Sequence, residues 1–309
     1  MTLLSPTADF WFFACFAFLF GLIFGSFLNV CIYRLPLGLS VVVPGSACPG
    51  CKTPIAAYDN IPVASWWILG GKCRTCKTAI SPRYWIVELL TGVLFFAAFI
   101  RLGPSLATVK LCVFSFLVLG LIFTDADTHL LPDALTIPGM WIGMAFAPFV
   151  AVSGIMGLLY AWTPLRPLDW HLASFLNALV GMILGATFIY LAGELWYHLR
   201  GIEAMGFGDV KLMGMVGAFL GPKLVLLTIF FGSFSGTAAG ISLAYIAYQK
   251  RKQRWKSSSL EVAHAKAQHA TQAMMRRFPI PFGVFLGIGA LISAFFGESL
   301  LRAYLGAFR

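Results

Sequence analysis

The stretch LATVKLCVFSFLVLGLIFT, residues 106–124, runs directly into the polar segment DADTHLLPD, residues 125–133. The first segment is long enough to cross a bilayer as a helix, since the hydrocarbon core takes about 20 apolar residues. Asp125 therefore stands at the end of a predicted membrane-spanning helix. Because an ionisable group at membrane depth is costly, a residue placed there indicates a functional site.

The composition extends this prediction to the whole chain. Of its 309 residues, 59% are hydrophobic and only 11% are charged, against about 25% charged in soluble proteins. Eight apolar segments can be placed, at 10–33, 84–101, 106–124, 134–154, 173–197, 209–221, 224–248 and 279–299. We predict an all-α polytopic membrane protein with about eight transmembrane helices. The first segment lacks a basic flank and a cleavage site, so we expect a retained helix rather than a signal peptide.

The sixth apolar segment is short and contains Gly214, Gly217 and Gly221. Short segments interrupted by glycine at membrane depth usually line a site or a cavity. We therefore expect these three glycines to break the sixth helix next to the functional site.

The basic residues orient the bundle. Sixteen of the 22 Lys and Arg residues fall on one side if the N-terminus is outside, in segments 34–83 and 250–277 and at Arg200 and Lys211. The positive-inside rule puts that side in the cytoplasm. Asp125 and Asp209 then reach the same membrane face. Topology also accounts for the net charge of +10, so we expect no nucleic-acid partner.

Four cysteines form two C-x-x-C pairs in the segment between the first two predicted helices: Cys48, Cys51, Cys73 and Cys76. Two disulfides or four unrelated thiols would also fit this pattern, but the reducing cytoplasm disfavours disulfides. The spacing is typical of a zinc ribbon with four thiolate ligands and no open coordination position. We expect three parts: helix 10–33, a cytoplasmic zinc-binding domain at 34–83, and a membrane core at 84–299 with a cytoplasmic loop at 250–277.

The acidic motifs each have an ordinary alternative. Asp127 and Asp133 fit a solvated turn as well as a site, and Asp209 fits a helix N-cap, which aspartate favours. Two glycines precede Asp209 in the string MGFGDVK, residues 205–211, and let the backbone approach a partner closely. Two carboxylates at one site share a proton unequally, which lets such a pair activate water.

Together these motifs resemble the type IV prepilin peptidases, intramembrane aspartyl proteases of pilus and type II secretion systems. The resemblance also covers GSFLNVCIYRLP at 25–36, DNIPVASWW at 59–67, SPRYWIVELLTG at 81–92 and PIPFGVFLGIGA at 279–290. It thus spans nearly the whole chain. Val284 departs from the pattern, which has proline at that position.

The resemblance implies cleavage of prepilin or pseudopilin leaders at the cytoplasmic face of the bacterial inner membrane, with Asp125 and Asp209 as the catalytic pair. It also implies methylation of the new N-terminus by S-adenosylmethionine, with structural zinc on the four cysteines. Glu88 and Glu203 are candidates for neutralising the substrate amine. Open alternatives are a peptidase without methyltransferase activity, a transporter that relays ions through the aspartates, and a zinc-ribbon scaffold without catalysis.

Overall fold

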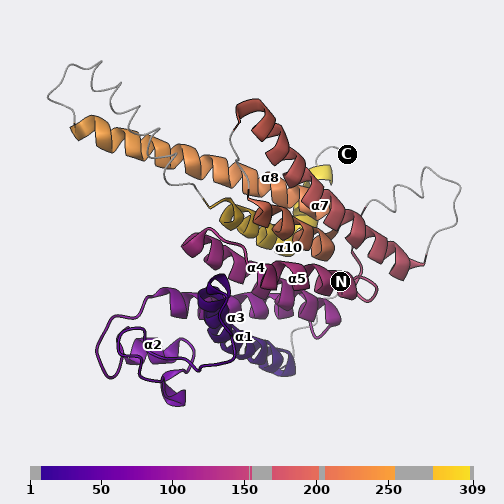
Figure 1. Cartoon of the computed structure of the whole chain (residues 1–309). Coiled ribbons are helices and arrows are strands. Elements are labelled where there is room, and N and C mark those ends of the chain that lie inside the picture. The colour runs from indigo at the N-terminus through magenta and orange to yellow at the C-terminus, as the bar shows by residue number, and fades with distance from the viewer. Residues whose placement is uncertain (1–7, 153, 155–168, 202–205, 255–280, 307–309) are drawn as a thin grey trace, which may run out of the picture.

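The computed structural model describes residues 8–152, 154, 169–201, 206–254 and 281–306, and these residues form a helical bundle (Figure 1). Within them, β pairing is limited to two isolated bridges in the four-cysteine segment. The helices are α1 (Ala8–Arg34), α2 (Ala64–Ile68), α3 (Arg83–Leu102), α4 (Leu106–Thr128), α5 (Asp133–Phe146), α7 (Trp170–Arg200), α8 (Phe207–Arg254) and α10 (Phe282–Gly306). The all-α membrane fold is thereby confirmed.

Six of these helices are long and apolar enough to cross a membrane: α1, α3, α4, α7, α8 and α10. The eight predicted segments map onto these six helices and α5, with two differences from the prediction. Segment 134–154 corresponds mainly to the 14-residue helix α5, which is shorter than a full span. Segments 209–221 and 224–248 both lie in α8, which changes direction at Gly221.

The direction change in α8 is a reversal, as its contacts with α7 show. A side chain at Gly181 of α7 would meet the backbone of Gly221, and one at Gly185 would meet both Met213 and Val225. Residues on either side of Gly221 thus lie at the same level of α7. Because Gly221 has φ 79° and ψ 177°, a conformation open essentially to glycine alone, the two arms of α8 run antiparallel. The prediction that Gly214 and Gly217 also break the helix is wrong, since both are helical.

Helix ends follow local sequence signals. Ser105 caps α4 by accepting a hydrogen bond from the Thr108 N–H at 3.3 Å. At the other end, His129 takes the left-handed conformation and its N–H donates to the Asp125 carbonyl at 2.9 Å. Pro132 then stands directly before α5, where a missing N–H costs nothing. This sequence of stop and start places Asp125 in the last turn of α4.

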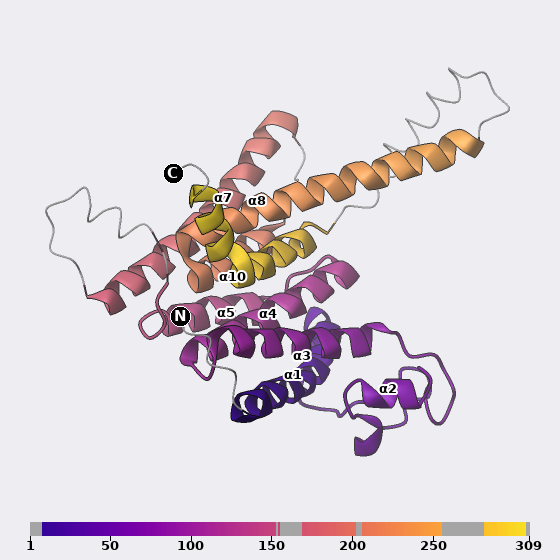
Figure 2. The same ribbon diagram turned by 180° about the vertical axis from the view of Figure 1, so that it is seen from behind.

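The helices form layers, seen from both sides in Figures 1 and 2, with α1 and α3 on one side, α4 and α5 between, and α7, α8 and α10 on the other. Small residues set the closest contacts. A Cβ at Gly25 of α1 would lie 2.6 Å from Glu88 Cα of α3, and one at Gly92 would meet Leu22 at 2.7 Å. The core between the layers includes the fully buried Phe114, Val118 and Leu286. Such packing fixes how the helix ends meet.

The expected loop 250–277 begins differently from the prediction. Residues up to Arg254 continue the second arm of α8, which projects beyond the other helices in Figure 1. Residues from 255 onward lie outside the described part of the chain.

Replacing Gly221 with alanine will destabilise the bundle. A Cβ cannot be accommodated at this φ and ψ without strain of about 1–3 kcal/mol, so we expect lower thermal stability of the purified protein in detergent. Gly214→Ala is the matched control, because Gly214 is helical and the atom nearest to a new Cβ is the flexible Met140 methyl at 3.2 Å. Equal stability of the two variants would contradict the assigned reversal.

Candidate active site

Asp125 and Asp209 come from different helices and are both buried, with exposed fractions of 5% and 8%. Asp125 lies in the last turn of α4 and Asp209 in the first turn of α8. Asp209 is inside the helix rather than at its N-cap, since its N–H donates to the carbonyl of Gly206 at 3.1 Å. The N-cap alternative is therefore not what the structure shows.

The two carboxylates meet at Gly283, in the first turn of α10. A Cβ built on Gly283 would lie 2.9 Å from Asp125 Oδ2 and 3.2 Å from Asp209 Oδ1. These two oxygens are thus no farther apart than the sum of those distances. The next residue, Val284, donates its backbone N–H to Asp125 Oδ2 at 3.0 Å. The first N–H groups of a helix have no partner within it, which leaves this one free to bind a carboxylate.

The neighbouring acids pair with bases instead of joining the two carboxylates. Asp127 forms an ion pair with Arg83 at the start of α3. Asp133, in the first turn of α5, accepts a hydrogen bond from Lys211 Nζ at 2.6 Å. Each pair ties the helix end that carries a buried aspartate to a second helix. Arg83, Asp127, Asp133 and Lys211 therefore surround the Asp125–Asp209 pair without entering it.

The four cysteines form a cluster in which all Sγ atoms lie within 4.8 Å of one another. The two C-x-x-C pairs are built alike: Cys48 N–H donates to the Thr53 carbonyl at 3.0 Å and Cys73 N–H to the Thr78 carbonyl at 2.9 Å. Sγ of Cys48 approaches Sγ of Cys76, from the other pair, at 3.6 Å. Four sulfurs on a tetrahedral zinc ion with bonds of about 2.3 Å have a similar mutual separation. The cluster is thus compatible with a zinc site.

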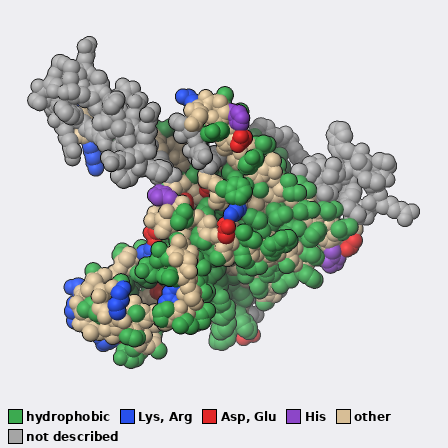
Figure 3. All heavy atoms as spheres, in the orientation of Figure 1, with side chains coloured by type: hydrophobic (Ala, Val, Ile, Leu, Met, Phe, Trp, Pro, Cys, Tyr) green, Lys and Arg blue, Asp and Glu red, His purple; other side chains and the backbone are tan. Residues whose placement is uncertain are grey.

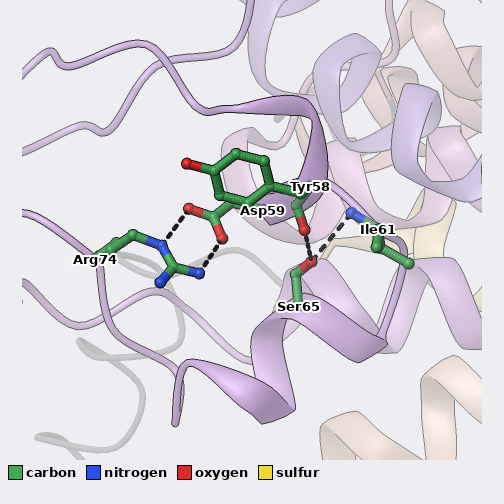
Figure 4. A network of polar contacts seen from close by, with 5 residues as sticks. All are labelled: Tyr58, Asp59, Ile61, Ser65 and Arg74. Carbon is green, nitrogen blue, oxygen red and sulfur yellow. Dashed lines mark hydrogen bonds and ion pairs between the residues drawn. The ribbon is translucent and has the colours of Figure 1, made fainter.

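A polar network connects the second cysteine pair to α2 (Figure 4). Arg74, between Cys73 and Cys76, donates two hydrogen bonds to Asp59 at 2.6 and 2.8 Å. These bonds hold the pKa of Asp59 below its usual value. Ser65 of α2 accepts a hydrogen bond from the Ile61 N–H and donates one to the Tyr58 carbonyl. The cysteine cluster and α2 are therefore parts of one folded unit.

Glu88 of α3 is buried against α1 and contacts this same folded unit. Its Oε2 accepts a hydrogen bond from the Val63 N–H at 2.6 Å, so it contacts the start of α2. The other candidate for neutralising a substrate amine, Glu203, lies outside the described residues.

Comparison with known proteins identifies the family that this chain matches. Residues 19–102 match the bacterial peptidase A24 N-terminal domain, and residues 111–241 match the type IV leader peptidase family. A prepilin leader peptidase/N-methyltransferase from Aeromonas salmonicida is 32% identical, over 96% of this chain and 94% of its own length. One from Pseudomonas aeruginosa is 31% identical, over 93% and 91%. One from Myxococcus xanthus is 39% identical, over 74% and 62%.

The chain belongs to the type IV leader peptidase family. The family and the enzyme class predicted from the sequence are thereby confirmed. No solved structure matches the chain.

The sequence analysis did not reveal that Gly283 and Val284 belong to the site. Both lie in the string PIPFGVFLGIGA, which carried the resemblance. The string predicts the start of the last helix but does not indicate which of its residues packs against an aspartate. That contact depends on the register between α10 and α4, which only the packed structure defines.

Proposed function

We propose that the chain cleaves the leader peptide from type IV prepilins or type II secretion pseudopilins, with Asp125 and Asp209 as its catalytic pair. The observation that supports this most directly is the meeting of two buried carboxylates around Gly283. The curated relatives bear the name prepilin leader peptidase/N-methyltransferase. An aspartate pair of this kind suits peptide hydrolysis, in which one carboxylate is ionised and the other protonated.

The hydrogen bond from Val284 distinguishes the two roles. Asp125 accepts this N–H and is assigned as the carboxylate that takes a proton from water. The water oxygen then bonds to the scissile carbonyl carbon. Asp209 gives its proton to the leaving nitrogen as the carbon–nitrogen bond breaks. The released products are the leader, with a new carboxyl group, and the mature chain, with a new amine.

We propose that the site lies at the cytoplasmic face of the bacterial inner membrane. The loop charges support this orientation, because the ends of α1 and α4 and the starts of α3, α5 and α8 lie together and the basic four-cysteine segment extends from them. A prepilin leader in the cytoplasm and an apolar pilin helix in the bilayer would meet at this level.

Zinc on Cys48, Cys51, Cys73 and Cys76 is proposed as a structural ion. A closed set of four thiolates leaves no position for substrate, and it would stabilise a segment too small to build its own core. This zinc-binding domain is proposed to span 34–83, from the last residue of α1 to the first residue of α3.

Methylation of the new amine with S-adenosylmethionine is proposed from the names of the relatives. The donor would supply the methyl group. Within the described residues no strand–glycine loop–helix unit is present to hold a nucleotide, and we assign no residue to this step. Glu88, a candidate for neutralising the substrate amine, also accepts a hydrogen bond from the Val63 N–H.

Substituting either aspartate will abolish cleavage. Asp125→Asn and Asp209→Asn each remove an acid–base group, and we expect the rate to fall at least about a hundredfold. The measurement is the mass change of a prepilin in proteoliposomes. Asp127→Asn and Asp133→Asn are matched controls that remove an ion pair only, with a smaller loss. Retained cleavage in either Asp125→Asn or Asp209→Asn would refute the protease assignment and favour a relay or scaffold role.

Gly283→Ala tests the meeting point of the two carboxylates. The new methyl group would press on both, so we expect a large loss of turnover while the protein stays folded. Gly236→Ala is the matched control, since a Cβ there meets nothing closer than 3.6 Å. Initial cleavage rates and thermal unfolding of both variants would be compared. Unchanged turnover in Gly283→Ala would contradict the proposed geometry.

Cys76→Ser will reduce bound zinc. We expect about one zinc per chain in the unaltered protein and a marked loss in the variant, measured by elemental mass spectrometry of purified protein. Cys112→Ser is the control, because Cys112 lies in α4 and outside the four-cysteine cluster. Equal zinc content in both variants would exclude this cluster as the metal site.

A further inference from the structure

The four-cysteine segment is attached to the membrane bundle at a point inside α3. Glu88 lies five residues after Arg83, which is about 7 Å along the helix, and its carboxylate accepts the Val63 N–H. Val63 has φ +61°, a costly conformation for a β-branched residue. The surrounding contacts must hold it there. The start of α2 is therefore fixed at the depth of the second turn of a membrane-spanning helix.

Tryptophans continue this attachment along α2. Trp67 lies 5.5 Å from Trp85 of α3 between ring centroids, and Trp66 lies 5.9 Å from the same ring. The indole N–H of Trp66 donates to the Ile80 carbonyl at 3.1 Å. Three tryptophans thus gather at the first turn of α3, a helix long and apolar enough to span a membrane. Tryptophan is enriched at this level of membrane proteins because its ring is apolar and its N–H is polar.

Much of the apolar surface of α2 and of the turn before it is exposed. Trp67 is 61% and Ile68 77% exposed in α2, and Ile61, three residues before α2, is 52% exposed. Large apolar side chains exposed together usually mark an interaction surface. These residues continue the apolar surface of α3, against which Trp67 packs. Whatever covers these exposed residues must therefore also be compatible with the lipid-facing surface of α3 at its cytoplasmic end.

The charge of the four-cysteine segment also favours a lipid surface. Between residues 35 and 82 there are four basic residues and one acid, and that acid, Asp59, is paired with Arg74. Lys52, Lys72 and Lys77 are exposed. Figure 3 shows Lys and Arg side chains along the outer edge of this part of the molecule, beside a hydrophobic surface. A segment that combines exposed lysines with exposed tryptophan and isoleucine suits a surface of phosphate headgroups and acyl chains.

We propose that α2 is an interfacial anchor: Trp67 and Ile68 insert into the headgroup–acyl boundary of the cytoplasmic leaflet, beneath lysines that contact anionic phospholipid. The four-cysteine segment would then lie against the bilayer instead of extending freely into solvent, and Glu88 would fix its depth.

Depth-dependent fluorescence quenching tests this. The full chain is reconstituted into phosphatidylethanolamine–phosphatidylglycerol liposomes whose acyl chains are brominated either near the headgroup or near the methyl end. The emission of Trp67 is obtained as the difference between the unaltered protein and Trp67→Phe. We expect shallow bromines to quench it at least about twofold more than deep ones. Trp141→Phe is the control, because Trp141 is 71% exposed and lies eight residues into α5; its difference emission should be quenched more by deep bromines.

A second variant guards against misfolding of Trp67→Phe. Ile68→Trp keeps Trp67 and adds a reporter at the most exposed large apolar residue of α2, and its added emission should show the same preference for shallow bromines. Quenching by aqueous iodide but by neither bromolipid would overturn the proposal and indicate that α2 faces a protein partner. Quenching as deep as that of Trp141 would also overturn it, because α2 would then lie within the hydrocarbon core.

Discussion

The structure depends on one steric constraint: two carboxylates from separate helices occupy the space that a side chain at position 283 would need. This requires α4, α8 and α10 to bring a last turn and two first turns to one point. Helix ends supply that arrangement more readily than helix middles, since their backbone N–H groups are free. The N–H of Val284 is used in this way on Asp125. A proline at this position would have no such N–H to offer.

Much of the bundle was predictable because the bilayer imposes simple rules. Apolar length gave the positions of the helices, and loop charge brought Asp125 and Asp209 to one face. The reversal of α8 could be anticipated only in part. Gly214, Gly217 and Gly221 look alike in sequence, yet only Gly221 leaves helical geometry. The other two accept close neighbours, Met140 and Gly181, and such contacts depend on tertiary packing.

In the candidate site too, features set by neighbouring residues in the sequence were predictable, and features set by tertiary packing were not. Cysteine spacing predicted a cluster because the two cysteines of a C-x-x-C pair lie in one turn, which places their sulfurs close together. The roles of Asp127, Asp133 and Glu88 were not predictable, because each depends on a partner far away in sequence: Arg83, Lys211 and the Val63 backbone. A carboxylate in a sequence looks the same whether it meets substrate, a base or a backbone N–H. Gly283 was hidden for a related reason, since it contributes by lacking a side chain.

The first arm of α8 has a consequence for how the enzyme tolerates different membranes. Every residue from Leu212 to Phe219 is buried, and the arm turns back at Gly221, about 18 Å from Asp209 by helical rise. Helices that face lipid adjust their tilt when bilayer thickness changes. The arm that carries Asp209 packs against α5, α7 and α10, so protein contacts set its position. Variation in lipid chain length would therefore be absorbed by the outer helices and leave the spacing of the two carboxylates unchanged.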